Sequence, residues 1–180
     1  LFTGNVSTKK GSMIVAADQT VFANKALGSD KYTIEVCFNS IEASSAGVVF
    51  GYKDDNNYGS AAFDTAKEEL VVTFVVGGEK SETRHKPVRS FDMAYDFKAV
   101  QAIQVEKKGN EFTFYVNDRE LCKVESDLAG GEKVGITTKG GSAGVGYFGA
   151  TAEVGGSSND AHYKPVTSQT GYIQANHCLE

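Results

Sequence analysis

The chain has 180 residues, a net charge of −5, 41% hydrophobic residues and 23% charged residues. This length and composition are typical of one globular domain with a sizeable core. The negative charge disfavours nucleic acid and anionic membrane surfaces as partners, because both are themselves negative. The longest apolar run, LVVTFVV at 70–76, suits one strand and is too short to span a membrane. We therefore expect no nucleic-acid partner and no membrane insertion.

Short runs of alternating apolar and polar residues follow one another along the chain, and clusters of Gly, Asp, Asn and Ser separate them. Such alternation predicts β-strands with one face in the core and one face in water. In chain order the predicted strands are 12–17, 20–24, 31–39, 46–53, 57–64, 68–77, 80–86, 97–108, 111–117, 119–125, 132–138 and 143–154. Helical periodicity is nearly absent.

Two joins between predicted strands read as tight hairpins, at Lys108–Asn110 and at Asn117-Asp118. Gly and Asn tolerate the positive φ that such reversals require. About a dozen short strands joined in this way predict an all-β fold, an antiparallel β-sandwich or jelly roll. Gln101 has the same parity as core-facing neighbours, so it needs a buried partner or marks a different register.

We expect residues 1–155 to form this single domain. Residues 156–180 lose the alternation and are predicted to form a tail or an edge segment, which could lead to a neighbouring domain. The chain starts at Leu1 rather than Met, which is typical of a fragment or a processed form.

The three cysteines, Cys37, Cys122 and Cys178, are widely spaced and odd in number. A scaffold of disulfides is therefore not expected. Cys37 and Cys122 lie within predicted strands, where packing as small apolar side chains is the expected role.

The stretch Asp54-Asp55-Asn56-Asn57 supplies several oxygen ligands within one turn, as a calcium ion requires. It lacks the EF-hand spacing, and Asp and Asn also favour turns for backbone reasons alone. With Tyr52 and Tyr58 on either side, the same turn could bind a sugar through hydrogen bonds and ring contacts. A metal site, a sugar-binding loop and a solvated hairpin all stay open.

Other candidate residues lie in separate strands. Glu35 faces away from the apolar side of its strand, so it is either a ligand contact or a polar residue on a half-wet sheet face. No second carboxylate accompanies it, and glycoside hydrolysis needs two. Arg84, beside His85, could bind ligand oxygens or simply line an exposed strand. No residue is therefore predicted to be catalytic.

Four segments in this order are more specific than the general pattern: AGVVFGYKDDNNYGSAAFD, LVVTFVVGGEKSETRHK, AIQVEKKGNEFTFYVNDRELCKVE and GEKVGITTKGGSAGVGYFGATAEV. Over roughly residues 30–154 the chain resembles the concanavalin A-like lectin/glucanase superfamily in its bacterial, laminin-G-like form. Within that superfamily it is similar to the carbohydrate-binding modules appended to levanases and other bacterial glycoside hydrolases. The chain departs from that pattern in two places: it has Gly51 after the VF pair instead of a basic residue, and it has no tryptophan.

The resemblance implies a non-catalytic, extracellular or cell-surface β-sandwich that binds carbohydrate, with other domains of the same polypeptide as further partners. No cofactor is required, although a structural calcium would fit the resemblance. The predicted ligand-binding residues are Glu35, Tyr52, Asp54, Asp55, Asn57, Tyr58 and Arg84. Two alternatives are a glycoside hydrolase or lyase of the same fold, and a protein-interaction or structural module.

Overall fold

The computed structural model describes residues 2–87, 101–129, 133–153, 163–165 and 173–174, and its regular elements in these ranges are all strands. The strands are β1 (Phe2–Thr3), β2 (Val6–Lys9), β3 (Ser12–Val15), β4 (Thr20–Ala23), β5 (Lys31–Ile41), β6 (Ser45–Asp54), β7 (Asn57–Asp64), β8 (Glu69–Val76), β9 (Glu79–His85), β10 (Gln101–Lys108), β11 (Glu111–Val116), β12 (Arg119–Glu125), β13 (Lys133–Lys139), β14 (Ala143–Glu153), β15 (Tyr163–Pro165) and β16 (Ile173–Gln174). Among these residues no helix is long and apolar enough to cross a membrane.

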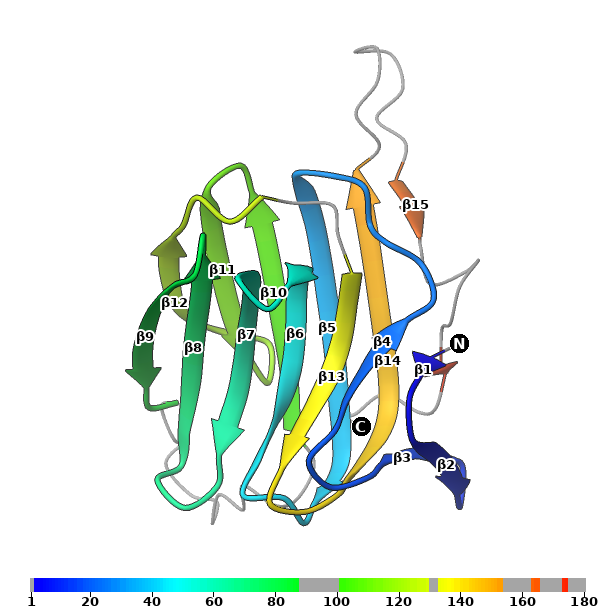
Figure 1. The fold of residues 1–180 in the computed structure, drawn as a ribbon. Coiled ribbons are helices and arrows are strands. Elements are labelled where there is room, and N and C mark those ends of the chain that lie inside the picture. Colours follow the sequence, from blue (N-terminus) through cyan, green and yellow to red (C-terminus); the bar gives the residue numbers. More distant parts are fainter. Residues whose placement is uncertain (1, 88–100, 130–132, 154–162, 166–172, 175–180) are drawn as a thin grey trace.

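Two antiparallel sheets stack face to face and form a sandwich (Figure 1). The first sheet has seven strands in the order β1-β4-β13-β6-β7-β8-β9. The second has nine strands, with the path β12-β11-β10-β5-β14-β3-β2 and with β15 and β16 also paired to β14. The predicted all-β antiparallel sandwich is confirmed.

The core lies between the sheets and is built by the alternation seen in the sequence. In β5, Tyr32, Ile34, Val36 and Phe38 all face this core. Phe50 of the seven-stranded sheet lies 5.5 Å from Phe112 of the other sheet, measured between ring centroids. Such aromatic pairs add about 0.5–1.5 kcal/mol beyond the apolar area they bury. The core therefore fixes which face of each strand is left for solvent or ligand.

The predicted hairpins are present, and their residues have the expected backbone conformation. Gly109 has φ of 61°, while Asn117 and Asp118 have φ of 50° and 64°. Gln101 is only 3% exposed, and the side-chain amide of Asn117 donates a hydrogen bond of 3.1 Å to its carbonyl oxygen. Gln101 thus has the predicted inward orientation, and its buried amide has a hydrogen-bond partner in the half-buried Asn117.

Some elements differ from the prediction. The short strands β1 and β2 were not predicted, because two to four largely exposed residues give no clear alternation. Residues 97–100, 132 and 154, which were included in predicted strands, lie outside the described residues, as does most of the segment 156–180. The parts of that segment that are described, β15 and β16, pair with the edge of β14.

The expectation for Cys37 missed a disulfide bond. Cys37 is bonded in a disulfide, whereas Cys122 is a free thiol. The side chain of Cys37 is fully buried, but it lies outside the main core cluster because its parity in β5 is opposite to that of Ile34 and Val36. Cys37 is therefore packed as a buried side chain, as expected, but as half of a disulfide rather than as a thiol.

Candidate functional site

A bulge in β6 determines where Tyr52 points. Lys133 pairs with Tyr52 and Gly135 pairs with Val49, so β6 takes three steps (52 − 49) where β13 takes two (135 − 133). Gly51 adopts a φ of 58°, which glycine reaches without strain. An extra residue reverses the alternation that follows it. Tyr52 therefore lies on the outer face of the seven-stranded sheet, although Val48 and Phe50 face the core.

Three half-buried aromatic side chains form a row on this outer face: Phe22 from β4, Tyr52 from β6 and Tyr58 from β7. We call them the aromatic cluster. The ring centroids of Phe22 and Tyr52 are 4.6 Å apart, and those of Tyr52 and Tyr58 are 6.1 Å apart. Phe22 joins two tyrosines that lie thirty or more residues later in the chain (52 − 22 = 30), because β4 and β6 both pair with β13.

The surface beside the cluster is apolar and holds small residues. Val49 is 5% exposed and Val75, the direct partner of Tyr58, is 6% exposed, although neither belongs to the main core cluster. A Cβ at Gly135 would lie 3.0 Å from Cδ1 of Phe22 and closer still to the Val21 carbonyl oxygen. Gly135 therefore leaves the space in which the Phe22 ring lies.

The β6–β7 hairpin borders the cluster with hydrogen-bonding groups. The Tyr52 hydroxyl donates to Asp55 Oδ1 at 2.8 Å. Asp54 Oδ1 accepts from the Asn56 backbone N–H at 2.9 Å and from the Asn57 amide at 3.0 Å. These bonds hold the turn, and a carboxylate has acceptor sites beyond the ones they use. The turn is thus a self-bonded hairpin that still presents polar oxygens to solvent.

The charges near the cluster follow from these contacts. The pKa of Asp54 is held below its usual range by the hydrogen bond from the Asn57 side chain and then by that from the Asn56 backbone. The pKa of the Tyr52 phenol is raised, first by its hydrogen bond to Asp55. Lys133 Nζ lies 5.9 Å from the centre of the Phe22 ring. The Tyr52 hydroxyl, the side chains of Asp54 and Asp55, and Lys133 therefore supply the polar groups around the aromatic cluster.

The structure brings together five of the seven predicted ligand-binding residues: Tyr52, Asp54, Asp55, Asn57 and Tyr58. Sequence reasoning missed Phe22, because no local pattern connects residue 22 with residue 52. The prediction of a strand at 20–24 already indicated that Phe22 has the parity opposite to Val21. Its neighbours could be known only from the order of the strands.

Arg84 shares the outer face but lies away from the cluster. Arg84 on β9 is the register partner of Val71 on β8, and Val71 is the register partner of Ala62 on β7. Ala62 is four residues along β7 from Tyr58. At about 3.3 Å per residue and about 4.8 Å per strand, Arg84 is roughly 16 Å from Tyr58. Its guanidinium contacts Asp64 at 3.1 Å, Glu69 at 3.3 Å and Glu82 at 3.4 Å. These carboxylates raise the pKa of Arg84, with the hydrogen bond to Asp64 contributing most.

Glu35 lies on the other sheet, between Gln104 of β10 and Gly149 of β14. It faces outward from the nine-stranded sheet, because Ile34 and Val36 face the core. Glu35 and the hairpin carboxylates therefore point away from opposite faces of the molecule. They do not form the facing pair that glycoside hydrolysis requires.

Within the described part of the chain, no group of three His, Cys, Asp or Glu side chains is placed to hold a metal ion. A calcium ion also accepts backbone carbonyl ligands, so structural calcium stays a prediction.

The fold is similar to that of several solved structures. The carbohydrate-binding module CBM66 from Bacillus subtilis matches with a TM-score of 0.62 and 15% identity, covering 80% of this chain and 91% of that one. Chicken galectin 2 matches with a TM-score of 0.56 and 14% identity, covering 76% of this chain and 99% of that one. The GH43 protein BlXynB from Bacillus licheniformis matches with a TM-score of 0.58 and 13% identity over 79% of this chain, which spans 33% of that protein.

No family model and no curated protein matches the sequence. At these identities the structural matches show the fold alone. The chain has the concanavalin A-like lectin/glucanase fold that the sequence resemblance implied.

Proposed function

We propose that this domain is a non-catalytic glycan-binding module of a larger secreted or cell-surface bacterial protein, and that saccharide binds at the aromatic cluster. The observation that carries the proposal is the row of Phe22, Tyr52 and Tyr58 on the outer face of the seven-stranded sheet, directly beside a hairpin rich in hydrogen-bonding groups. Half-buried rings with polar tips suit a ligand that is apolar on its faces and polar at its edges.

Sugars have this character. The C–H faces of a pyranose or furanose ring would lie on Tyr52 and Tyr58, while its hydroxyls donate to the carboxylates of Asp54 and Asp55. The Asn57 amide and the Lys133 ammonium are donors for sugar oxygens. Glu35 and Arg84 lie too far from the cluster to contact the same sugar residue.

The site is organised before ligand arrives. The bonds from Tyr52 to Asp55 and from Asn57 to Asp54 fix the hairpin side chains, and Asn57 also accepts a hydrogen bond of 3.0 Å from the Gly77 backbone. Side chains that are already ordered lose little rotamer entropy on binding. This supports reversible binding on a rigid surface rather than closure around a substrate.

One observation supports the extracellular setting. Disulfides persist in oxidising compartments, and Cys37 is bonded in one.

Calorimetric titration with a panel of neutral saccharides tests the proposal. We expect binding in the millimolar range or tighter, and Tyr52→Ala should weaken it by at least about tenfold, which corresponds to about 1.4 kcal/mol. Tyr52→Phe keeps the ring and should weaken it less. Tyr115→Ala, which removes a half-buried ring from the opposite sheet, is the matched control and should bind like the wild type. If no saccharide binds at millimolar concentration, the proposal is wrong.

A further inference from the structure

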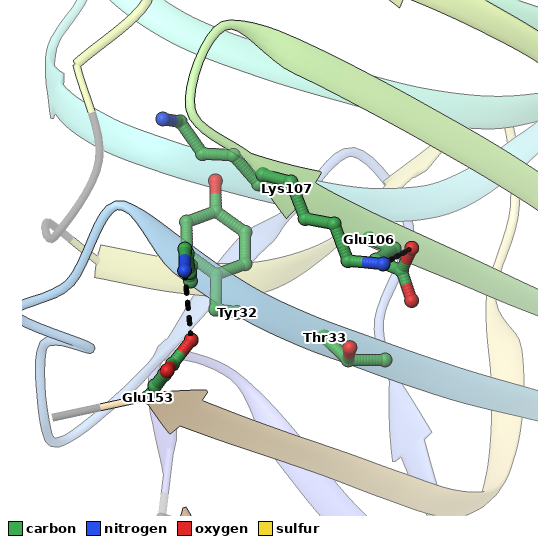
Figure 2. A pocket seen from close by; sticks show the side chains of 7 residues that line it. Tyr32, Thr33, Glu106, Lys107 and Glu153 are labelled. Carbon is green, nitrogen blue, oxygen red and sulfur yellow. Dashed lines mark ion pairs between the residues drawn. The ribbon is translucent and has the colours of Figure 1, made fainter. Parts of the chain in front are cut away.

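A small pocket lies on the nine-stranded sheet where β5 begins and where β10 and β14 end (Figure 2). Its volume is about 80 Å³. Sites that enclose a small molecule are usually larger than roughly 300 Å³, and one water occupies about 30 Å³ of liquid. The pocket therefore accommodates one functional group rather than a whole sugar ring. It is lined by Lys31, Tyr32, Thr33, Glu106, Lys107, Lys108 and Glu153.

Two lysines sit directly opposite each other at this pocket. Lys31 of β5 is the register partner of Lys108 of β10, and their side chains are 59% and 66% exposed. Like charges directly opposite on neighbouring strands repel each other. Each ammonium turns instead to a glutamate, Lys31 to Glu153 at 3.4 Å and Lys108 to Glu106 at 3.0 Å. Figure 2 labels the two glutamates and marks both ion pairs with dashed lines.

These ion pairs are easily exchanged. Exposed pairs contribute only about 0–1 kcal/mol each, because water screens them and the long side chains lose entropy. An anion that enters the pocket can therefore replace either glutamate at little cost. Thr33 is the next outward-facing residue after Lys31 on β5, opposite Glu106, and its hydroxyl is a further donor at the pocket.

A third lysine adds positive charge behind the pocket. Lys107 is 2% exposed, and its ammonium donates to the backbone carbonyls of Gly109 and Asp30 at 2.5 and 3.5 Å. Its carboxylate partner among the described residues, Asp30 Oδ1, lies 3.4 Å away on a side chain that is 78% exposed. Solvent screens that carboxylate more than it screens the buried ammonium. The Lys107 ammonium also lies 5.3 Å from the centre of the Phe112 ring, so it is held on the core side of the sheet, behind the pocket.

We propose that this pocket binds the carboxylate or sulfate group of an acidic saccharide, with Lys31 and Lys108 as its cationic partners and Thr33 as a hydrogen-bond donor. The pocket lies on the opposite sheet from the aromatic cluster, so it is a second, separate site. The inference that the anionic group belongs to a sugar rests on the proposed function. The inference that the pocket binds an oxyanion rests on the pocket alone. A polyanion such as nucleic acid fits less well, since the whole chain has a net charge of −5.

Amide and lysine side-chain chemical shifts, followed by NMR during titration, test this proposal. The probes are sodium glucuronate, glucose and inorganic sulfate. We expect glucuronate to shift the signals of residues 31–33 and 106–108, glucose to leave them unchanged, and the affinity for glucuronate to fall as salt is added.

Two double variants should change the affinity for glucuronate in opposite directions. Lys31→Gln with Lys108→Gln should weaken glucuronate binding by at least about tenfold. Glu106→Gln with Glu153→Gln should strengthen it several-fold, because both lysines lose their competing carboxylates. Lys80→Gln is the matched control, since Lys80 is equally exposed (61%) and also pairs with a glutamate, but lies on β9. It should leave binding unchanged.

Three results would overturn the proposal: no shift with glucuronate, weaker binding in the double glutamate variant, or sulfate binding as tightly as glucuronate, which indicates an inorganic-anion site only. The titration also distinguishes failure of this proposal from failure of the proposed saccharide site at the aromatic cluster. If glucuronate shifts residues 31–33 while no saccharide affects Tyr52, the pocket stands and the aromatic site does not.

Discussion

The Gly51→Ala variant tests the packing around the bulge in β6 that positions Tyr52. An L-residue in the left-handed region costs roughly 1–2 kcal/mol, and about 0.4–1 kcal/mol is regained because alanine restricts the unfolded chain. The new Cβ would also lie 2.9 Å from Leu128 Cδ2 and 3.2 Å from the Ala129 carbonyl oxygen. Moving Leu128 aside adds about 1 kcal/mol. We expect the free energy of unfolding to fall by about 2 kcal/mol.

Gly109→Ala provides the matched control. Gly109 has φ of 61° against 58° for Gly51, but a Cβ there would meet nothing within 4 Å. It should therefore lose only the backbone part, about 1 kcal/mol. Urea denaturation followed by tyrosine fluorescence measures both variants, with m-values compared to confirm that the unfolding transition is unchanged. If Gly51→Ala is no less stable than Gly109→Ala, the packing around the bulge is not as described.

Two further predictions concern a buried hydroxyl and a half-buried thiol on the nine-stranded sheet. The Tyr32 hydroxyl is buried without a hydrogen-bond partner among the described residues, and burial together with Asp30 raises the pKa of its phenol far above its usual range. Tyr32→Phe should therefore raise the free energy of unfolding by about 1 kcal/mol, and a loss of that size in urea denaturation would show that the hydroxyl is satisfied. Burial, and then Glu120, raises the pKa of the Cys122 thiol to about 11 from 9.0, so at pH 8 its alkylation by iodoacetamide should be about 100-fold slower than that of an ordinary thiol. Peptide mass spectrometry measures this alkylation rate, and Glu120→Gln should increase the rate. Alkylation as fast as that of a free peptide thiol would refute the burial argument.

Much of the fold could be predicted because alternation and turns are local properties of the sequence. The hairpin at Asn117-Asp118 needed only residues that tolerate positive φ, and the structure has them there. Gln101 could be recognised as a buried polar group from parity alone. The Asp54–Asn57 turn was also readable, since its bonds join residues two or three apart.

The composition of the candidate site was less predictable, because it depends on strand order and on one bulge. Continuing the alternation of Val48 and Phe50 would put Tyr52 in the core, and only the extra residue at Gly51 turns it outward. Phe22 joins the cluster through β13, a strand more than a hundred residues later in the chain. For the same reason, the sequence could not show that Arg84 and Glu35 lie apart from the hairpin.

The aromatic cluster as the place where saccharide binds is the central claim, and chemical-shift mapping with ¹³C-labelled aromatic side chains tests it most directly. Titration with a saccharide that binds in calorimetry should shift the ring signals of Phe22, Tyr52 and Tyr58 along one saturation curve and leave Tyr115 unchanged. Shifts confined to Tyr115 and its sheet, or binding that leaves all three cluster rings unmoved, would contradict the account.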